Sequence, residues 1–224
     1  MKVLIYDDAC PLCTWYSGEF VKRGAVDNRL AFGQLPHRLR KSIDMQRACS
    51  EIPLVDTKTG QVDYGVAAIL PALGRLFRYG GLLRSAGLQA VVRPVYALVS
   101  YNRRVVIPLS HPREGFDPAP PFHRGWRLTF ITVLLVISAA IQYFLSVRTG
   151  QPLWLLSLGV ATLAAIGGLY RNPSAWEFAG RSALRYAGWS LLSLPVVFLS
   201  GLPVLLAWCL FQYGFFVHLF RMRG

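Results

Sequence analysis

The fold is decided near the N-terminus by one stretch that joins a short apolar run to two cysteines, Val3-Leu4-Ile5-Tyr6-Asp7-Asp8-Ala9-Cys10-Pro11-Leu12-Cys13. The apolar run is typical of a short strand, and the apolar residues after Cys13 recur mostly on one helical face. Pro11 suits the first helical position, because its fixed φ is helical and its missing N–H would have no partner there. We therefore expect a strand, a loop and a helix, with both cysteines at the helix N-terminus.

The spacing of the two cysteines has a chemical consequence. Two intervening residues on the first helical turn bring the sulfurs within disulfide range. Cys10 would lie where unpaired N–H groups and the helix dipole favour the thiolate, which is the nucleophile. Cys13, one turn deeper, could attack a mixed disulfide on Cys10 and release the partner. The pattern predicts a nucleophilic Cys10 and a resolving Cys13, with no cofactor beyond the redox-active Cys10–Cys13 disulfide.

Three other interpretations of the pair stay open. Zinc needs four ligands, and only His37 and Cys49 could complete a set, at a spacing that matches no common zinc pattern. A structural disulfide fits poorly with a chain that begins without an export signal. The cysteines could also be inert core residues. The strand–turn–helix context favours the redox interpretation over all three.

The stretch from Tyr6 to Cys13 resembles the DCC family of predicted thiol–disulfide oxidoreductases, which is named for an Asp-x-x-Cys-x-x-Cys signature that Asp7, Cys10 and Cys13 match. A second element, Tyr96 followed by Tyr101-Asn102-Arg103-Arg104, is similar to the tyrosine and Asn-Arg element that closes the family's domain. The resemblance covers roughly residues 2 to 107. It implies a thioredoxin-like fold and thiol–disulfide chemistry, but it names no substrate, because the family is itself largely assigned by sequence.

One position departs from the family pattern, which usually has glycine where this chain has Asp8. Aspartate tolerates a positive φ better than most residues, so the turn can survive. A second carboxylate near Cys10 is expected to raise the pKa of that thiol and to reduce its reactivity.

Two further residues are candidates for the site. Asp7 ends the first strand, where it could accept or relay the proton of Cys13, or equally cap the following helix. Pro53 stands where thioredoxin-like folds place a cis-proline that faces the dithiol. The alternative is a trans proline at the first residue of a strand.

The elements are predicted in the order β-α-β-α-β-β-α, which is that of an α/β thioredoxin-like domain: 2–6, 11–23, 29–34, 36–50, 52–56, 61–64 and 65–79. This domain is expected over 1–106 with a basic C-terminal helix. A proline-rich linker follows at 107–122, and an α-helical transmembrane domain at 123–224.

The net charge of +13 is spread unevenly. Residues 1–64 carry nine basic and eight acidic side chains, whereas residues 65–224 carry 15 basic and three acidic ones. Six arginines lie within 75–104, where a helical stripe of apolar residues begins at Leu88. This segment predicts a basic amphipathic helix on anionic lipid headgroups, or a domain helix with a solvated arginine face. Nucleic-acid binding is disfavoured, because no nucleic-acid motif accompanies the arginines.

The C-terminal half predicts an integral, multi-pass membrane domain. The apolar fraction is 54% and the mean hydropathy +0.39. About four spans are expected, near 128–147, 150–170, 183–200 and 203–220, each about long enough for a hydrocarbon core of ~30 Å. Arginines precede the first span, follow the fourth span and lie in the loop between the second and third spans, and these three regions face the same side of the membrane. The positive-inside rule then places the N-terminal domain and the C-terminus in the cytoplasm.

Two functions from different classes follow. The first is a membrane-anchored thiol–disulfide oxidoreductase, whose partner is a protein or small-molecule thiol or disulfide. The second is a non-catalytic membrane subunit or assembly factor, whose thioredoxin-like domain docks a membrane-protein partner. Asp8 and the small-residue second span, with Gly159, Ala161, Ala164 and Gly167, motivate the second hypothesis.

Overall fold

A computed structural model describes residues 1–77, 81, 83, 85–107, 118–149 and 173–199. The chain divides into two compact units, Met1–Trp126 and Arg127–Gly224. Each unit is described by itself below.

The first unit is built on a mixed four-stranded sheet in the order β2-β1-β3-β4. The central strand β1 (Lys2–Tyr6) pairs parallel with β2 (Asn28–Ala31) and antiparallel with β3 (Pro53–Asp56). The hairpin partner of β3 is β4 (Val62–Tyr64). A parallel β1–β2 pair requires a crossover, which the helix α1 (Pro11–Lys22) supplies. This arrangement fits the predicted thioredoxin-like domain.

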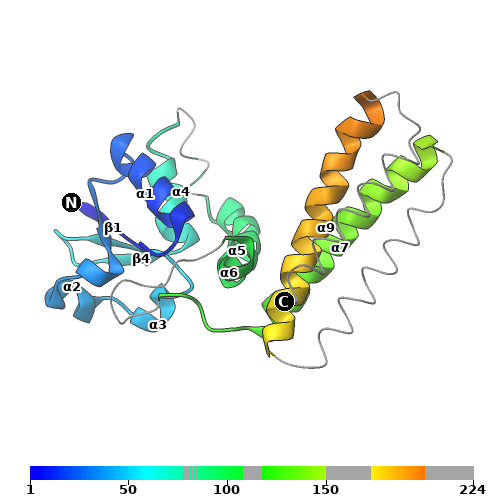
Figure 1. The fold of residues 1–224 in the computed structure, drawn as a ribbon. Helices are drawn as coiled ribbons and strands as arrows, with labels where there is room; N and C mark the ends of the chain where they lie inside the picture. Colours follow the sequence, from blue (N-terminus) through cyan, green and yellow to red (C-terminus); the bar gives the residue numbers. More distant parts are fainter. Residues whose placement is uncertain (78–80, 82, 84, 108–117, 150–172, 200–224) are drawn as a thin grey trace. The chain divides into compact units, whose positions relative to one another are not determined.

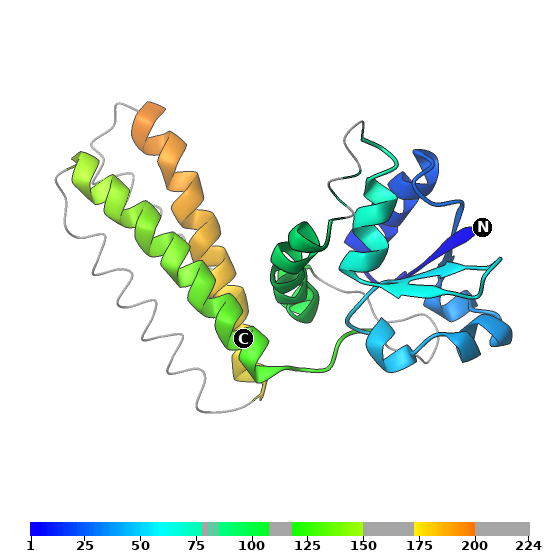
Figure 2. The same cartoon turned by 180° about the vertical axis from the view of Figure 1, so that it is seen from behind.

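Helices cover both faces of the sheet (Figures 1 and 2). On one face α1 and α4 (Val66–Leu73) pack around Leu4, Phe20 and Leu54. On the other face α2 (His37–Ser42) and α3 (Met45–Ala48) pack around a second cluster, whose buried members are Val3, Ile5, Phe32, Ile43, Ala48 and Val55. The alternation Val3, Leu4, Ile5 fills both cores, because successive strand residues point to opposite faces.

Several element boundaries differ from the prediction. The helix expected over 36–50 is two helices, because Ile43 has an extended backbone and Asp44 caps α3 by accepting the Arg47 N–H at 3.0 Å. The strand expected over 29–34 ends at Ala31, and a short 3-10 helix, η1 (Phe32–Gln34), follows. The turn between β3 and β4 contains Gly60, whose φ is +74°.

The predicted basic helix corresponds to α5 (Ala86–Tyr101), which runs through Pro94, followed by α6 (Arg103–Val106). Val91, Val95 and Val99 are exposed on one face of α5. Of the six arginines in the segment, Arg103 is buried and bonded within the domain. Its assignment to a lipid-facing surface is therefore wrong, while lipid binding by the rest of the segment stays a prediction.

The second unit contains α9 (Pro173–Leu199) and all of α7 (Arg124–Thr149) except its first three residues, which belong to the first unit. They pack through Ile131, Trp176, Ala179 and Ala183. Among the described residues, one helix segment, Arg124–Val147, is long and apolar enough to cross a membrane, and α9 is not a second such segment. The predicted span over 183–200 is the later part of α9, which begins ten residues earlier. The spans predicted at 150–170 and 203–220 lie outside the described residues, so a four-helix bundle and a multi-pass topology are not established.

Candidate redox site

Both cysteines lie where the sequence predicts them, at the start of α1. Cys10 is the N-cap residue of α1, and its Sγ accepts the Cys13 backbone N–H at 3.4 Å. The first amides of a helix have no partner within the helix, so a sulfur at the cap satisfies one of them. All three cysteines in the described part of the chain, Cys10, Cys13 and Cys49, are free thiols.

The two thiols differ in acidity because one hydrogen bond joins them. The pKa of Cys10 is lowered from 9.0 to about 6, chiefly by the hydrogen bond from the Cys13 side chain, with help from the Cys13 amide and the Arg103 charge. Burial and the Asp7 carboxylate oppose this shift. The same hydrogen bond, together with burial, raises the pKa of Cys13. Cys10 is therefore the thiolate near neutral pH and Cys13 the protonated donor.

Asp7 is buried, lines the same cavity as the two cysteines and is paired with an arginine that is distant in the sequence. Its Oδ2 lies 3.0 Å from Nη2 of Arg103, and its Oδ1 accepts the Ala9 N–H at 3.0 Å. The prediction that Asp7 caps α1 is wrong, because Cys10 occupies the cap. A proton relay from Cys13 through Asp7 stays a prediction.

Asp8 does not have the predicted effect on the site. Its side chain is exposed, and no non-glycine residue in the described part of the chain has a positive φ, so its turn needs no unusual backbone. The expected rise in the pKa of Cys10 is also wrong, since that pKa is lowered and the opposing carboxylate is Asp7. An exposed carboxylate acts through water, which weakens its field.

Pro53 begins β3, as predicted, but the Ile52–Pro53 peptide bond is trans, so the cis alternative is wrong. The residue before it, Ile52, lines the cavity beside the dithiol. The Ile52 N–H donates to the Tyr96 hydroxyl at 3.1 Å, which ties the start of β3 to α5.

The sulfurs face a cavity rather than open solvent. Cys10 is 1% exposed and Cys13 6% exposed. Both line a cavity of about 260 Å³ whose wall is mainly apolar and aromatic, including Leu12, Phe20, Phe32, Ile52, Ile69 and Val99. Burial alone would agree with inert core cysteines, but a lowered pKa and a cavity at the sulfurs favour reactivity.

Tyr16 also lines this cavity and carries a buried hydroxyl. A hydrogen-bonding interaction with this hydroxyl lowers the pKa of Cys13, although the contact lacks ordinary hydrogen-bond geometry and no other described residue bonds the hydroxyl. Burial raises the pKa of Tyr16 well above its usual value, so the hydroxyl keeps its proton.

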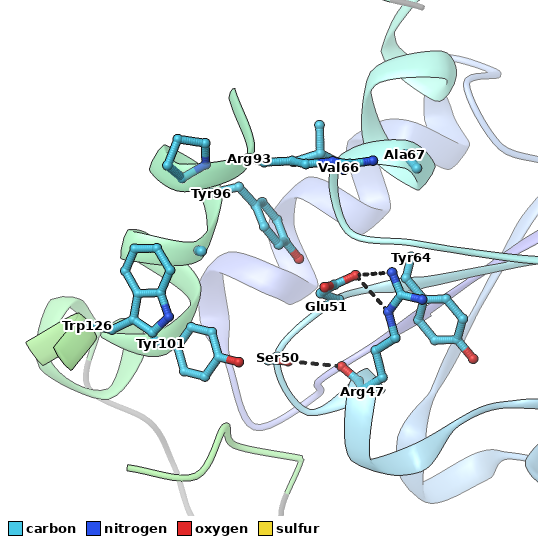
Figure 3. A pocket seen from close by; sticks show the side chains of 12 residues that line it. Arg47, Ser50, Glu51, Tyr64, Val66, Ala67, Arg93, Tyr96, Tyr101 and Trp126 are labelled. Atoms are coloured by element: carbon cyan, nitrogen blue, oxygen red, sulfur yellow. Dashed lines mark hydrogen bonds and ion pairs between the residues drawn. The ribbon is translucent and has the colours of Figure 1, made fainter. Parts of the chain in front are cut away.

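A second cavity, of about 310 Å³, shares Ser50, Glu51 and Tyr96 with the first (Figure 3). Three of its residues interact with one another: Arg47 donates two hydrogen bonds to Glu51 and lies over the Tyr64 ring. The stacked rings of Tyr101 and Trp126 form part of its wall. This cavity does not contact the sulfurs.

The part of the chain with a described structure holds no group of three or more histidine, cysteine, aspartate and glutamate side chains that could bind a metal ion. The Cys49 thiol instead donates to the Met45 carbonyl at 3.2 Å within α3. The zinc alternative with His37 and Cys49 has no support there.

Sequence reasoning gave Arg103 and Tyr16 no role in the site. Arg103 appeared only in the second family element and in the basic segment, and its proximity to Asp7 depends on the fold. The family element, in which Asn102 precedes Arg103, was the available sequence signal for Arg103. Asn102 is fully buried, and its side-chain amide donates to the carbonyls of Leu98 at 2.8 Å and Trp126 at 3.1 Å. Tyr16 appeared only as part of an apolar helix face.

Together, the mixed sheet, the capped dithiol and the adjacent cavity define a thioredoxin-like thiol domain. Residues 4–107 match the family model described as DCC1-like thiol-disulfide oxidoreductase. The match supports the resemblance to the DCC family and spans the domain from β1 to Ile107, which is slightly less than half of the chain. No curated protein and no solved structure gives a significant match to the chain.

Proposed function

We propose that this chain is a membrane-anchored thiol–disulfide oxidoreductase in which Cys10 is the nucleophile and Cys13 the resolving thiol. The observation that carries the proposal is the Cys10 sulfur at the helix N-cap, where it accepts the Cys13 backbone N–H and where the pKa of the thiol is lowered. The match to a thiol–disulfide oxidoreductase family supports the same chemistry.

The reaction would proceed in two exchange steps. The Cys10 thiolate attacks one sulfur of the substrate disulfide, forms a mixed disulfide and expels the other substrate sulfur as a thiolate. Cys13 then loses its proton and attacks the Cys10 sulfur. The product is a reduced substrate with two thiols, and the chain keeps the Cys10–Cys13 disulfide. Arg103 would stabilise negative charge on both sulfurs, since its charge lowers the pKa of each.

The experiment compares full-length Cys10→Ser and Cys13→Ser variants with the wild type in detergent. Wild-type protein should reduce a test disulfide, Cys10→Ser should not, and Cys13→Ser should accumulate a mixed disulfide on Cys10 that mass spectrometry detects. Equal exchange by all three proteins would show that the catalytic assignment is wrong.

Membrane anchoring and orientation belong to the same proposal. The apolar segment of α7 supports an anchor, and the arginine distribution supports a cytoplasmic N-terminal domain. Protease treatment of sealed inverted vesicles and of intact cells tests the orientation. Cleavage of the N-terminal domain in intact cells would contradict it.

A second candidate is a non-catalytic membrane subunit or assembly factor, which the near-complete burial of Cys10 favours. In that case a stoichiometric partner should co-purify in mild detergent and remain bound after Cys10→Ala. A chain that purifies alone and reduces a test disulfide would exclude this candidate.

A further inference from the structure

The cavity beside the dithiol restricts what can reach Cys10. The Cys10 side chain is 1% exposed, so a reactant must enter the cavity before it meets the sulfur. At about 260 Å³ the cavity lies near the lower end of small-molecule sites. It has room for a single substituted ring, whereas a disulfide on the surface of a folded protein would not reach the sulfur.

The lining indicates an apolar reactant. The rings of Tyr16, Phe20 and Phe32 and the aliphatic side chains of Ile52 and Val99 form much of the wall. Val99 also belongs to the exposed face of α5 that carries Val91 and Val95, because residues four apart share a helix face. The cavity wall thus continues into an exposed apolar surface, which suits a reactant that partitions into lipid.

Two buried polar groups of wall residues have no hydrogen-bond partner of ordinary geometry among the described residues, the Tyr16 hydroxyl and Nε of Arg103. A buried hydroxyl without such a partner is costly. The Tyr16 hydroxyl lies beside Cys13 and keeps its proton, so it can donate a hydrogen bond to an acceptor placed next to the sulfurs. An apolar ring that carries a carbonyl oxygen meets both requirements.

We propose that this cavity binds a para-quinone, which oxidises Cys10 and Cys13 to the disulfide and leaves as the hydroquinone. The inference rests on the thiol chemistry proposed above, and in it the quinone takes the place of the substrate disulfide as the oxidant of the dithiol. The Cys10 thiolate adds to a ring carbon, so that a C–S bond forms and the negative charge moves to a quinone oxygen. The Tyr16 hydroxyl donates a hydrogen bond to that oxygen as the charge develops.

The second step returns both electrons to the ring. Cys13 gives its proton to solvent and attacks the Cys10 sulfur, the S–S bond forms, and the C–S bond breaks with its electron pair entering the ring. The hydroquinone dianion takes up two protons, equal in number to those that the two thiols lost. The net reaction converts two thiols and one quinone into one disulfide and one hydroquinone.

The test uses reduced full-length protein in detergent without oxygen, and duroquinone, whose fully methylated ring disfavours permanent arylation of thiols. Oxidised glutathione and a leucine-flanked cystine peptide are the comparison oxidants. Loss of quinone absorbance and the Cys10–Cys13 disulfide, identified by mass spectrometry, are followed together. We expect one quinone consumed per dithiol, faster than oxidation by either disulfide at equal concentration.

Two variants probe the cavity itself. Tyr16→Phe should slow oxidation by duroquinone about tenfold to a hundredfold, the range of a hydrogen bond to a developing charge. Tyr6→Phe also loses a hydroxyl, but Tyr6 does not line the cavity, so its rate should match the wild type. Val99→Lys, which places a charge in the wall, should raise the quinone concentration needed for half-maximal rate.

The outcomes separate this inference from the proposed function. If either disulfide oxidises the dithiol and duroquinone does not, or if Tyr16→Phe reacts as fast as the wild type, the quinone inference is overturned and the oxidoreductase proposal stands. A peptide disulfide that reacts faster than the quinone likewise overturns it, in favour of a peptide substrate. If no oxidant produces the Cys10–Cys13 disulfide, both proposals fall.

Discussion

The hydrogen bond from the Cys13 thiol to the Cys10 sulfur can be tested by two substitutions at the same position. Cys13→Ala removes the side-chain donor, whereas Cys13→Ser replaces it with a hydroxyl donor. Both variants keep the backbone N–H of residue 13, which also bonds the Cys10 sulfur at 3.4 Å. A difference between the two variants therefore isolates the side-chain hydrogen bond.

The magnitude follows from the strength of a charged hydrogen bond. Such a bond contributes about 1.5–3 kcal/mol, which at about 1.4 kcal/mol per pKa unit corresponds to about one to two units. The pKa of Cys10 is about 6 in the wild type. It should therefore rise to about 7–8 in Cys13→Ala and stay near the wild-type value in Cys13→Ser. Near pH 7 the thiolate would fall from most of the population to half or less.

The assay is a titration in a chain whose Cys49 and Cys209 are replaced by serine, so that Cys10 is the only thiol in each variant. Ultraviolet absorbance of the thiolate is recorded between about pH 5 and 10, and the rate of reaction with iodoacetamide is measured on the same samples. Absorbance does not depend on access to the cavity, so it controls for the burial of the sulfur. Equal midpoints in the alanine and serine variants would refute the assigned role of the side-chain hydrogen bond.

Three further predictions concern charge, pH and backbone conformation. Asp7→Asn should lower the pKa of Cys10 and Arg103→Met should raise it, because the carboxylate opposes the thiolate and the guanidinium favours it. Thiolate absorbance measures the pKa of Cys10 in both variants. Shifts of the same sign would contradict these electrostatic roles. Because the pKa of Cys10 is lowered, the reduced protein should become more stable than Cys10→Ser as pH rises from about 6 towards 9.0, by up to about 4 kcal/mol, and should lose that gain as pH falls through 6. Chemical unfolding at a series of pH values measures the difference in unfolding free energy. A difference that does not change with pH would count against the lowered pKa. Gly65→Ala should lower the melting temperature more than Gly60→Ala. Both residues have a positive φ, but a Cβ at Gly65 would lie 3.2 Å from atoms of Glu51 and Tyr96, whereas a Cβ at Gly60 would face open space. Equal melting temperatures of the two variants would show that the close approach at Gly65 has no energetic cost.

Much of the fold could be predicted because its signals are local. The alternating apolar residues of β1, the proline at the first turn of α1 and the glycine in the β3–β4 turn each act within a few residues of their own position. The helix break at Asp44 was missed, because a capping aspartate inside a partly apolar segment resembles an ordinary polar helix residue. The sequence left the choice between a cis and a trans bond before Pro53 open, because the cis alternative came from fold analogy rather than from a local signal.

By itself, the sequence determined that a dithiol stands at the N-terminus of a helix after a buried strand, and that the C-terminal half is apolar and basic. Only the tertiary structure placed Arg103 against Asp7, lined one cavity with residues from across the domain, and left the Tyr16 hydroxyl buried beside Cys13. The physical reason is the distance along the chain over which each interaction acts. Capping and turn formation depend on neighbouring residues, whereas the ion pair joins groups 96 positions apart in the sequence and forms only when the folded domain brings Arg103 of α6 to Asp7.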